Sequence, residues 1–109
     1  MNEDLKRLKK ALHPEKQINI VEQCRIVYEA LAVDGEFQGR RNDLASYLEL
    51  SPSAVYKMYR SHRDAVPELK EWFKGTEYQT NTYYDKATLT KEEQRMWLRD
   101  MKILVTGVD

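Results

Sequence analysis

The sequence predicts an all-α protein, and three observations lead to that class: few helix breakers, many helix formers and a helical spacing of apolar residues. Only four Gly and three Pro occur in 109 residues, so few positions break a helix. Helix-favouring Leu, Ala, Lys, Glu and Arg are abundant, and apolar residues recur at intervals of three and four. The 41% hydrophobic content is typical of folded chains, and this length suits one modest core. We therefore expect a single compact multi-helix domain over residues 1–109, with a helix-turn-helix at about 41–62.

Two helices are predicted before residue 40. The first covers residues 2–12, where leucines recur at helical spacing among lysines, and the following His-Pro pair ends it. The second covers residues 17–32, whose wide apolar stripe includes Cys24 and is typical of a central core helix. The turn signal "DGEFQG" (34–39) follows. We expect Phe37 in that turn to fold back onto the core.

The segment "RNDLASYLELSPSAVYKMYRSH" (41–62) predicts two short helices set at an angle. The first covers residues 41–48. The second begins sharply, because Ser51 is placed to cap it and Pro52 takes the first helical position, where a missing N–H costs nothing. Ala45 is the small residue that two crossing helices require at their contact. The side chains expected to face inward are Leu44, Ala45, Leu48, Val55, Met58 and Tyr59.

Three stretches complete the chain. A helix is expected within residues 67–75, between a proline and a glycine. The polar, aromatic segment "TEYQTNTYY" (76–84) is poorly periodic, which leaves a loop or a short helix open. The last helix is expected over 89–104, starting at a capping box formed by Thr90 and Glu93. One face of this last helix carries Trp97, Met101 and Leu104.

The outward side of the second helix of the 41–62 segment carries the residues that suggest DNA binding. Lysine and arginine reach phosphates or guanine edges, serines at a helix N-terminus bond phosphate, and tyrosine bonds a phosphate or touches a thymine methyl. Two arginines at the beginning of the first helix are placed to clamp the adjacent backbone. The candidate DNA-binding residues are Arg40, Arg41, Ser51, Ser53, Ala54, Tyr56, Lys57, Arg60 and Ser61.

The charge pattern supports this interpretation locally, although the net formal charge is zero. Residues 51–63 carry three basic side chains and no acidic one, whereas residues 17–39 carry one arginine and four carboxylates. Such an asymmetry can orient a neutral protein toward a polyanion. The alternative is an ordinary helical hairpin with solvated charges. Glu49, where a helix-turn-helix often has glycine, requires a left-handed or adjusted turn and brings a carboxylate near the expected phosphate path.

These residues resemble a family. "RRNDLASYLELSPSAVYKMYRSHRDAVPELKEWFKG" followed by "LTKEEQRMW" is similar to the central DNA-binding region of ParB-type partition proteins and their nucleoid-occlusion relatives. The shared pattern is L-A-x-x-L-x-x-S-x-x-x-V, then a Pro-initiated helix, a Gly, and a helix that opens with an acidic pair and Gln. The resemblance covers residues 40–97. It implies an all-helical domain that binds duplex DNA, often as a homodimer on an inverted repeat.

The family's arginine-rich nucleotide-binding motif is absent from this sequence, as is a recognisable C-terminal dimerisation domain. CTP hydrolysis and clamp sliding are therefore not carried over. A small transcriptional regulator or partition-like adaptor, of a phage or mobile-element type, fits better than a complete partition protein.

Other chemistry finds little support in the sequence. The two histidines and the lone Cys24 form no metal-ligand pattern, and there is no phosphate-binding glycine loop. We expect no enzymatic activity, no cofactor and no metal. The N-terminus lacks the apolar run of a signal peptide, and no stretch is long enough to span a bilayer, so a cytoplasmic, nucleoid-associated protein is expected.

The second hypothesis is a helical protein-interaction module, such as an anti-repressor or an inhibitor of a host protein. It rests on the zero net charge and on aromatic residues that would anchor an interface if exposed. Those candidates are Trp72, Tyr78, Tyr83, Tyr84 and Trp97. The same residues could instead belong to the core, or pair two copies of the chain.

Overall fold

Helices account for most of the chain that the structure describes. The computed structural model describes residues 3–12, 18–75 and 80–106. Within these ranges it has α-helices and no strand, which confirms the all-α class. The helices are α1 (Glu3–Leu12), α2 (Ile20–Leu31), α3 (Arg41–Leu48), α4 (Pro52–Asp64), α5 (Pro67–Lys74), α6 (Thr80–Ala87) and α7 (Lys91–Thr106).

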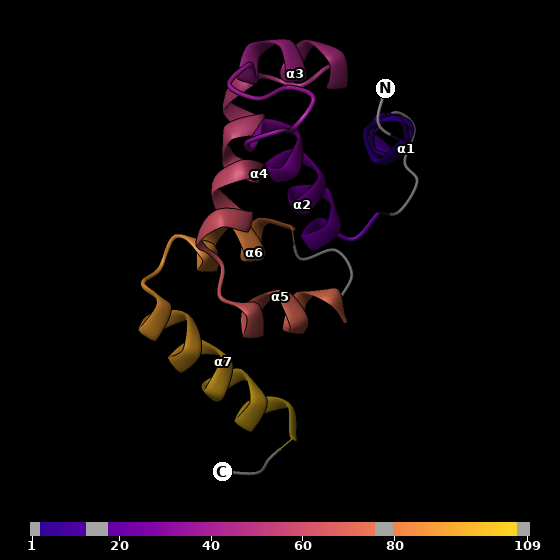
Figure 1. Ribbon diagram of the computed structural model, residues 1–109. Coiled ribbons are helices and arrows are strands. Elements are labelled where there is room, and N and C mark those ends of the chain that lie inside the picture. The colour runs from indigo at the N-terminus through magenta and orange to yellow at the C-terminus, as the bar shows by residue number, and fades with distance from the viewer. Residues whose placement is uncertain (1–2, 13–17, 76–79, 107–109) are drawn as a thin grey trace.

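The helices are arranged around a central pair, α2 and α4, which pack against each other more extensively than any other two (Figure 1). α3 lies across one end of this pair, and α1 lies beside α2 and also contacts α3. α5 lies at the other end, and α7 packs on α5 and extends away from the body (Figure 1). The molecule is therefore elongated, 47 × 27 × 21 Å, with α3 and α7 at opposite ends.

A continuous hydrophobic core connects all seven of these helices. Five of the six inward residues predicted for the 41–62 segment are confirmed, because Leu44, Ala45, Leu48, Val55 and Met58 are all buried, whereas Tyr59 is only half-buried against the core. Phe37 folds back onto the core as expected. Cys24 is fully buried, and its burial raises the pKa of the thiol to about 12, so it belongs to the core as an inert thiol.

Side-chain caps fix where the helices begin. Asn19 Oδ1 accepts a hydrogen bond from Val21 N at 2.9 Å, and Asn19 Nδ2 donates to Phe73 O at 2.9 Å, which ties the start of α2 to the end of α5. The predicted capping box is confirmed. Glu93 N donates to Thr90 Oγ1 and Thr90 N donates to Glu93 Oε1, both at 3.1 Å.

A tight turn after α2 requires glycine at one position. A Cβ on Gly35 would lie 2.2 Å from Glu29 O and 2.4 Å from Ala30 O, well inside van der Waals contact. Phe37 N donates to Ala30 O at 2.8 Å in the same turn. The close approach of the chain to the end of α2 thus brings α3 back across the helix pair.

The segment for which the sequence left two alternatives contributes a helix. Residues 80–87 form α6, while residues 76–79 lie outside the described part of the chain. Tyr83 of α6 is fully buried and packs edge-on against Phe73, with ring centroids 5.3 Å apart. α6 also packs against α4, so it adds a third neighbour to a helix that already contacts α2 and α3.

We expect the folded protein to lose stability in mildly acidic solution because of His62. Its ring lies 4.9 Å from that of Tyr28, and burial, then the Lys70 and Arg25 charges, lower its pKa from 6.5 to about 4 against the opposing effect of Glu29. In the unfolded chain the His62 ring is protonated as the pH falls through about 6.5, whereas in the folded chain it stays neutral until about pH 4. Protonation therefore favours the unfolded chain, and the free energy of unfolding should fall as pH falls through that interval.

Urea unfolding at a series of pH values measures this effect. The informative interval lies above about pH 5, because the stability contributed by carboxyl groups with a lowered pKa, such as Glu22 and Asp64, is lost below it. His62→Gln should flatten the dependence there, and an equal slope in that variant would contradict the assignment to His62. His13 is present in both proteins and cancels in the comparison.

Candidate nucleic-acid interface

The α3–α4 pair has the turn geometry that the sequence suggested. α3 ends at Glu49, which adopts the left-handed conformation with φ 59° and ψ 41°. Glu49 N donates to Ser46 O at 3.2 Å and Leu50 N donates to Ala45 O at 2.9 Å, which closes the helix end. The expected left-handed turn is confirmed, and α4 starts only three residues later.

The N-terminal turn of α4 is exposed and free of acidic residues. Ser51 is its N-cap, with Oγ accepting from Ala54 N at 3.1 Å, and its hydroxyl proton remains available to a second acceptor. Ser53 is exposed, whereas Ala54 is half-buried. Tyr56, one turn beyond Ser53, is 40% exposed although it is a large apolar ring. This end of α4 thus presents hydroxyl groups at the positive end of a helix dipole.

Arg41 and Lys57 are the strongest basic candidates. The Arg41 guanidinium carbon lies 5.4 Å from the centre of the Tyr56 ring, and Lys57 Nζ lies 5.4 Å from the centre of the Tyr84 ring. Both side chains are exposed, and within residues 3–12, 18–75 and 80–106 no carboxylate forms an ion pair with either. The aromatic rings hold the two cations in place while their charge stays available.

Arg40 is less available. Its Nη2 donates to Glu36 O at 2.6 Å, and its Nη1 lies 3.5 Å from Asp43 Oδ2. The guanidinium also lies 5.0 Å from the centre of the Phe37 ring. Arg40 is therefore committed to the loop before α3 and shares its charge with Asp43.

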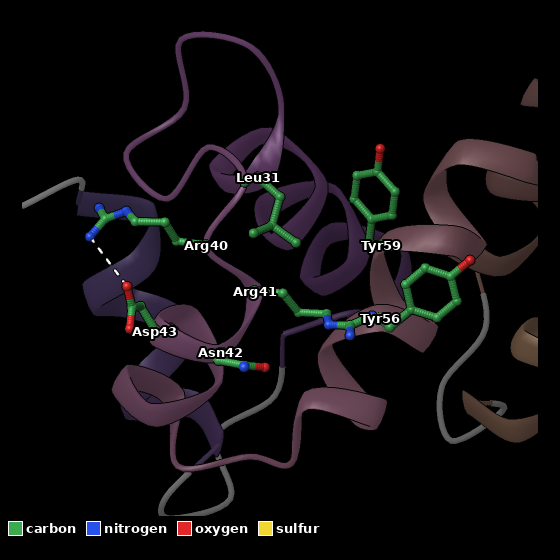
Figure 2. Close-up of a pocket in the computed structure, with 8 residues that line it drawn as sticks. Leu31, Arg40, Arg41, Asn42, Asp43, Tyr56 and Tyr59 are labelled. Atoms are coloured by element: carbon green, nitrogen blue, oxygen red, sulfur yellow. Dashed lines mark ion pairs between the residues drawn. The ribbon is translucent and has the colours of Figure 1, made fainter.

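A hollow of about 650 Å³ separates the start of α3 from the outer side of α4. Figure 2 shows the Arg41 side chain reaching across it toward Tyr56, with Tyr59 on the same helix and the Arg40–Asp43 ion pair at the opposite rim. The Tyr56 and Tyr59 rings stack 6.4 Å apart. The hollow is lined by Leu31, Gly39, Arg40, Arg41, Asn42, Asp43, Tyr56 and Tyr59. Sequence reasoning missed Asn42 and Tyr59 here, because Tyr59 shares the inward periodicity of α4.

Two predicted contacts at the far end of α4 differ in the structure. Ser61 was expected to face outward, which is wrong: it is fully buried and its Oγ donates to Lys57 O at 2.8 Å. Arg60 is only half-exposed, and its Nε is enclosed with no hydrogen-bond partner among the described residues. The physical reason is that α4 is packed on more than one side, by α2 and α3 and also by α6.

The aromatic residues that were candidates for an exposed interface belong mostly to the core. Tyr83 is fully buried, which is the core alternative that the sequence left open, and burial raises the pKa of its hydroxyl. Trp72, Tyr84 and Trp97 are half-buried and pack against the core. Trp97 stacks on Phe73 with ring centroids 5.9 Å apart. Tyr78 lies outside the described residues.

Comparison of the chain with protein-family models, with curated proteins and with solved structures finds no match. In the part of the chain that the structure describes, no helix is both long enough and apolar enough to cross a membrane.

Proposed function

We propose that the protein binds double-stranded DNA through α3 and α4, used as a helix-turn-helix whose α4 enters the major groove. The observation that carries the proposal is the Arg41 guanidinium held over Tyr56. This places an unpaired cation and an exposed aromatic side chain beside the acid-free N-terminal turn of α4. Phosphate groups bind cations and helix N-termini, and base edges bind the side chains of the inserted helix.

Each residue has a distinct role in this proposal. Arg41, with a smaller share from Arg40, contacts the phosphate backbone beside the groove. Ser51 donates its hydroxyl to a phosphate at the positive end of α4. Ser53, Tyr56 and Lys57 face the base edges, where lysine recognises guanine and tyrosine contacts a thymine methyl. Ala54 contributes a small surface beside them, and Arg60 contributes positive charge from the flank.

The biological role that best fits this activity is a small transcriptional regulator or a partition-like adaptor, of a phage or mobile-element type, acting at the nucleoid in the cytoplasm. A homodimer would match an inverted-repeat site, because the two-fold axis of the protein then coincides with that of the DNA. No enzymatic step or cofactor is part of the proposal.

A second candidate is a protein-interaction module, and one observation favours it. Met96 and Leu104 on α7 are 55% and 77% exposed, and α7 extends from the body at the end opposite α3 (Figure 1). Exposed apolar side chains on a projecting helix are typical of surfaces that bind another helix. This surface is compatible with DNA binding at the other end.

Selection of bound fragments from a random pool of duplex DNA tests the proposal. A recovered motif would support it, and the symmetry of the motif would report whether two copies bind together. Recovery of no enriched sequence, together with no retention of duplex DNA at low salt, would contradict DNA binding and favour the protein-interaction module.

A further inference from the structure

A second basic surface lies beside the α3–α4 turn. It forms a hollow of about 530 Å³ between α1 and the end of α3. The residues that line it are Glu3, Lys6, Arg7, Lys9, Lys10, Tyr47 and Glu49. We call this the α1 basic surface. It was not among the candidate sites that the sequence suggested.

The core holds α1 in a defined position next to α3. Leu5 and Leu8 are fully buried, and α1 contacts both α2 and α3. Lys9 Nζ lies 4.6 Å from the centre of the Tyr47 ring on α3. Figure 1 shows α1 at the same end of the molecule as α3. The lysines of α1 are thus presented by a packed helix, at fixed positions relative to the start of α4.

Most of the positive charge on this surface is uncommitted. Arg7 is shared by Asp4 and Glu22, at 3.5 and 3.4 Å. Lys6 has only a distant, exposed partner in Glu3 at 3.5 Å. Among the described residues, no ion pair forms with Lys9 or Lys10. Exposed ion pairs of this kind are weak, so these lysines remain free to bind an anion.

The α1 basic surface also accounts for Glu49, whose carboxylate lies close to the expected phosphate path. Glu49 lines the same hollow as four basic side chains and Glu3. The cations therefore outnumber the carboxylates at the place where Glu49 alone would repel a phosphate. A polyanion that meets the α3–α4 turn would find a net positive surface there.

We propose that the α1 basic surface binds the phosphate backbone of the same duplex that α4 reads, with Lys6, Lys9 and Lys10 as the contacting residues. This inference rests on the proposed DNA binding and adds a second contact to it. Lysines that contact only phosphates contribute affinity without sequence preference. The surface therefore sets how tightly the protein holds DNA, while α4 sets which sequence it prefers.

Salt-dependent binding measures the contribution of these lysines. The probe is a fluorescein-labelled duplex of mixed sequence, titrated by anisotropy between about 50 and 200 mM salt. Lys6→Ala with Lys10→Ala should weaken binding about tenfold at the lowest salt and reduce the slope of log K against log salt by about 1 to 2. The preference between a selected motif and the mixed sequence should stay unchanged.

Matched variants separate this effect from a general loss of charge. Lys91→Ala with Arg99→Ala removes the same charge from exposed positions of α7, the helix that lies at the other end of the molecule from α3 (Figure 1), and should bind like the wild type. Glu49→Gln should strengthen binding a few-fold, because it removes a carboxylate from the α1 basic surface.

The outcomes distinguish this inference from the proposed function. Unchanged affinity and slope in the Lys6 and Lys10 variant, with normal binding by the wild type, would overturn the inference alone. A wild-type protein that binds no duplex at any salt would overturn the proposed function as well. Equal binding to polyglutamate, with the same dependence on Lys6 and Lys10, would overturn the inference in favour of an acidic protein partner.

Discussion

Replacing Arg41 and Lys57 together with alanine should weaken binding to a selected DNA site about 100-fold and leave the fold intact. Both side chains are exposed and are held over tyrosine rings, so neither carries core packing. Arg41 is expected to make one phosphate contact and Lys57 one base contact, and the loss of each contact should lower the affinity about tenfold. Fluorescence anisotropy with the selected duplex measures the affinity, and circular dichroism verifies the fold.

The α7 variant with Lys91 and Arg99 replaced by alanine is the matched control, because it loses the same charge far from α3. If both double variants weaken binding equally, the effect reflects net charge and the proposed surface is wrong. A selective loss in the Arg41 and Lys57 variant supports the surface.

Gln94→Ala should destabilise the protein by about 3 kcal/mol, which is large for a single side chain. Gln94 is fully buried and connects three segments. Its Oε1 accepts from Val66 N at 2.8 Å, and its Nε2 donates to Asp64 O at 2.9 Å and Leu89 O at 3.0 Å. Alanine would remove the partner of one buried and two partly buried backbone groups and leave a cavity beside them.

Urea unfolding measures this loss, with Gln38→Ala as the control. Gln38 is exposed and its Oε1 only accepts from Asp34 N at 3.3 Å, so its removal should change the unfolding free energy by less than about 0.5 kcal/mol. An equal effect of the two substitutions would show that the Gln94 hydrogen bonds contribute nothing beyond those of a surface amide.

The structural role of Gln94 weakens the resemblance to ParB-type proteins as an argument for DNA binding. The acidic pair and glutamine that open α7 were part of that resemblance. In this structure Glu93 closes the capping box and Gln94 connects the α4–α5 junction to α7. Both residues are thus explained by the fold of this chain, and the proposal of DNA binding rests on α3 and α4 alone.

Local sequence patterns predicted the elements whose burial is strictly periodic. The apolar spacing in the 41–62 segment identified the buried apolar residues of α3 and α4, because these residues lie at helical intervals along the inner side of each helix. The capping box and the left-handed Glu49 were predictable for the same reason, since both depend on residues within a few positions. The sequence did not decide between a loop and a helix for α6, because "TNTYYDKA" is mostly polar. Tyr83 is buried by packing against Phe73 of another helix, and that contact cannot be read from the local pattern.

The candidate site could be predicted only in part. Arg41 and Tyr56 appeared in the sequence as separate exposed residues, whereas their contact depends on how α3 crosses α4. Ser61 was misplaced because a second packed flank, formed by distant residues, cannot be read from the periodicity of α4. The α1 basic surface was missed because α1 and Glu49 lie about forty positions apart in the chain.

In the proposed complex with DNA, the α6 helix along the flank of α4 would limit how much DNA sequence one molecule recognises. With Ser61 buried and Arg60 partly enclosed, only the first turns of α4 would reach base edges in that complex. In an inserted helix that leaves three or four side chains, which read about four base pairs. A site of about four base pairs recurs throughout any genome. Recognition of one particular site would therefore require two copies of the protein bound to neighbouring half-sites at a fixed spacing.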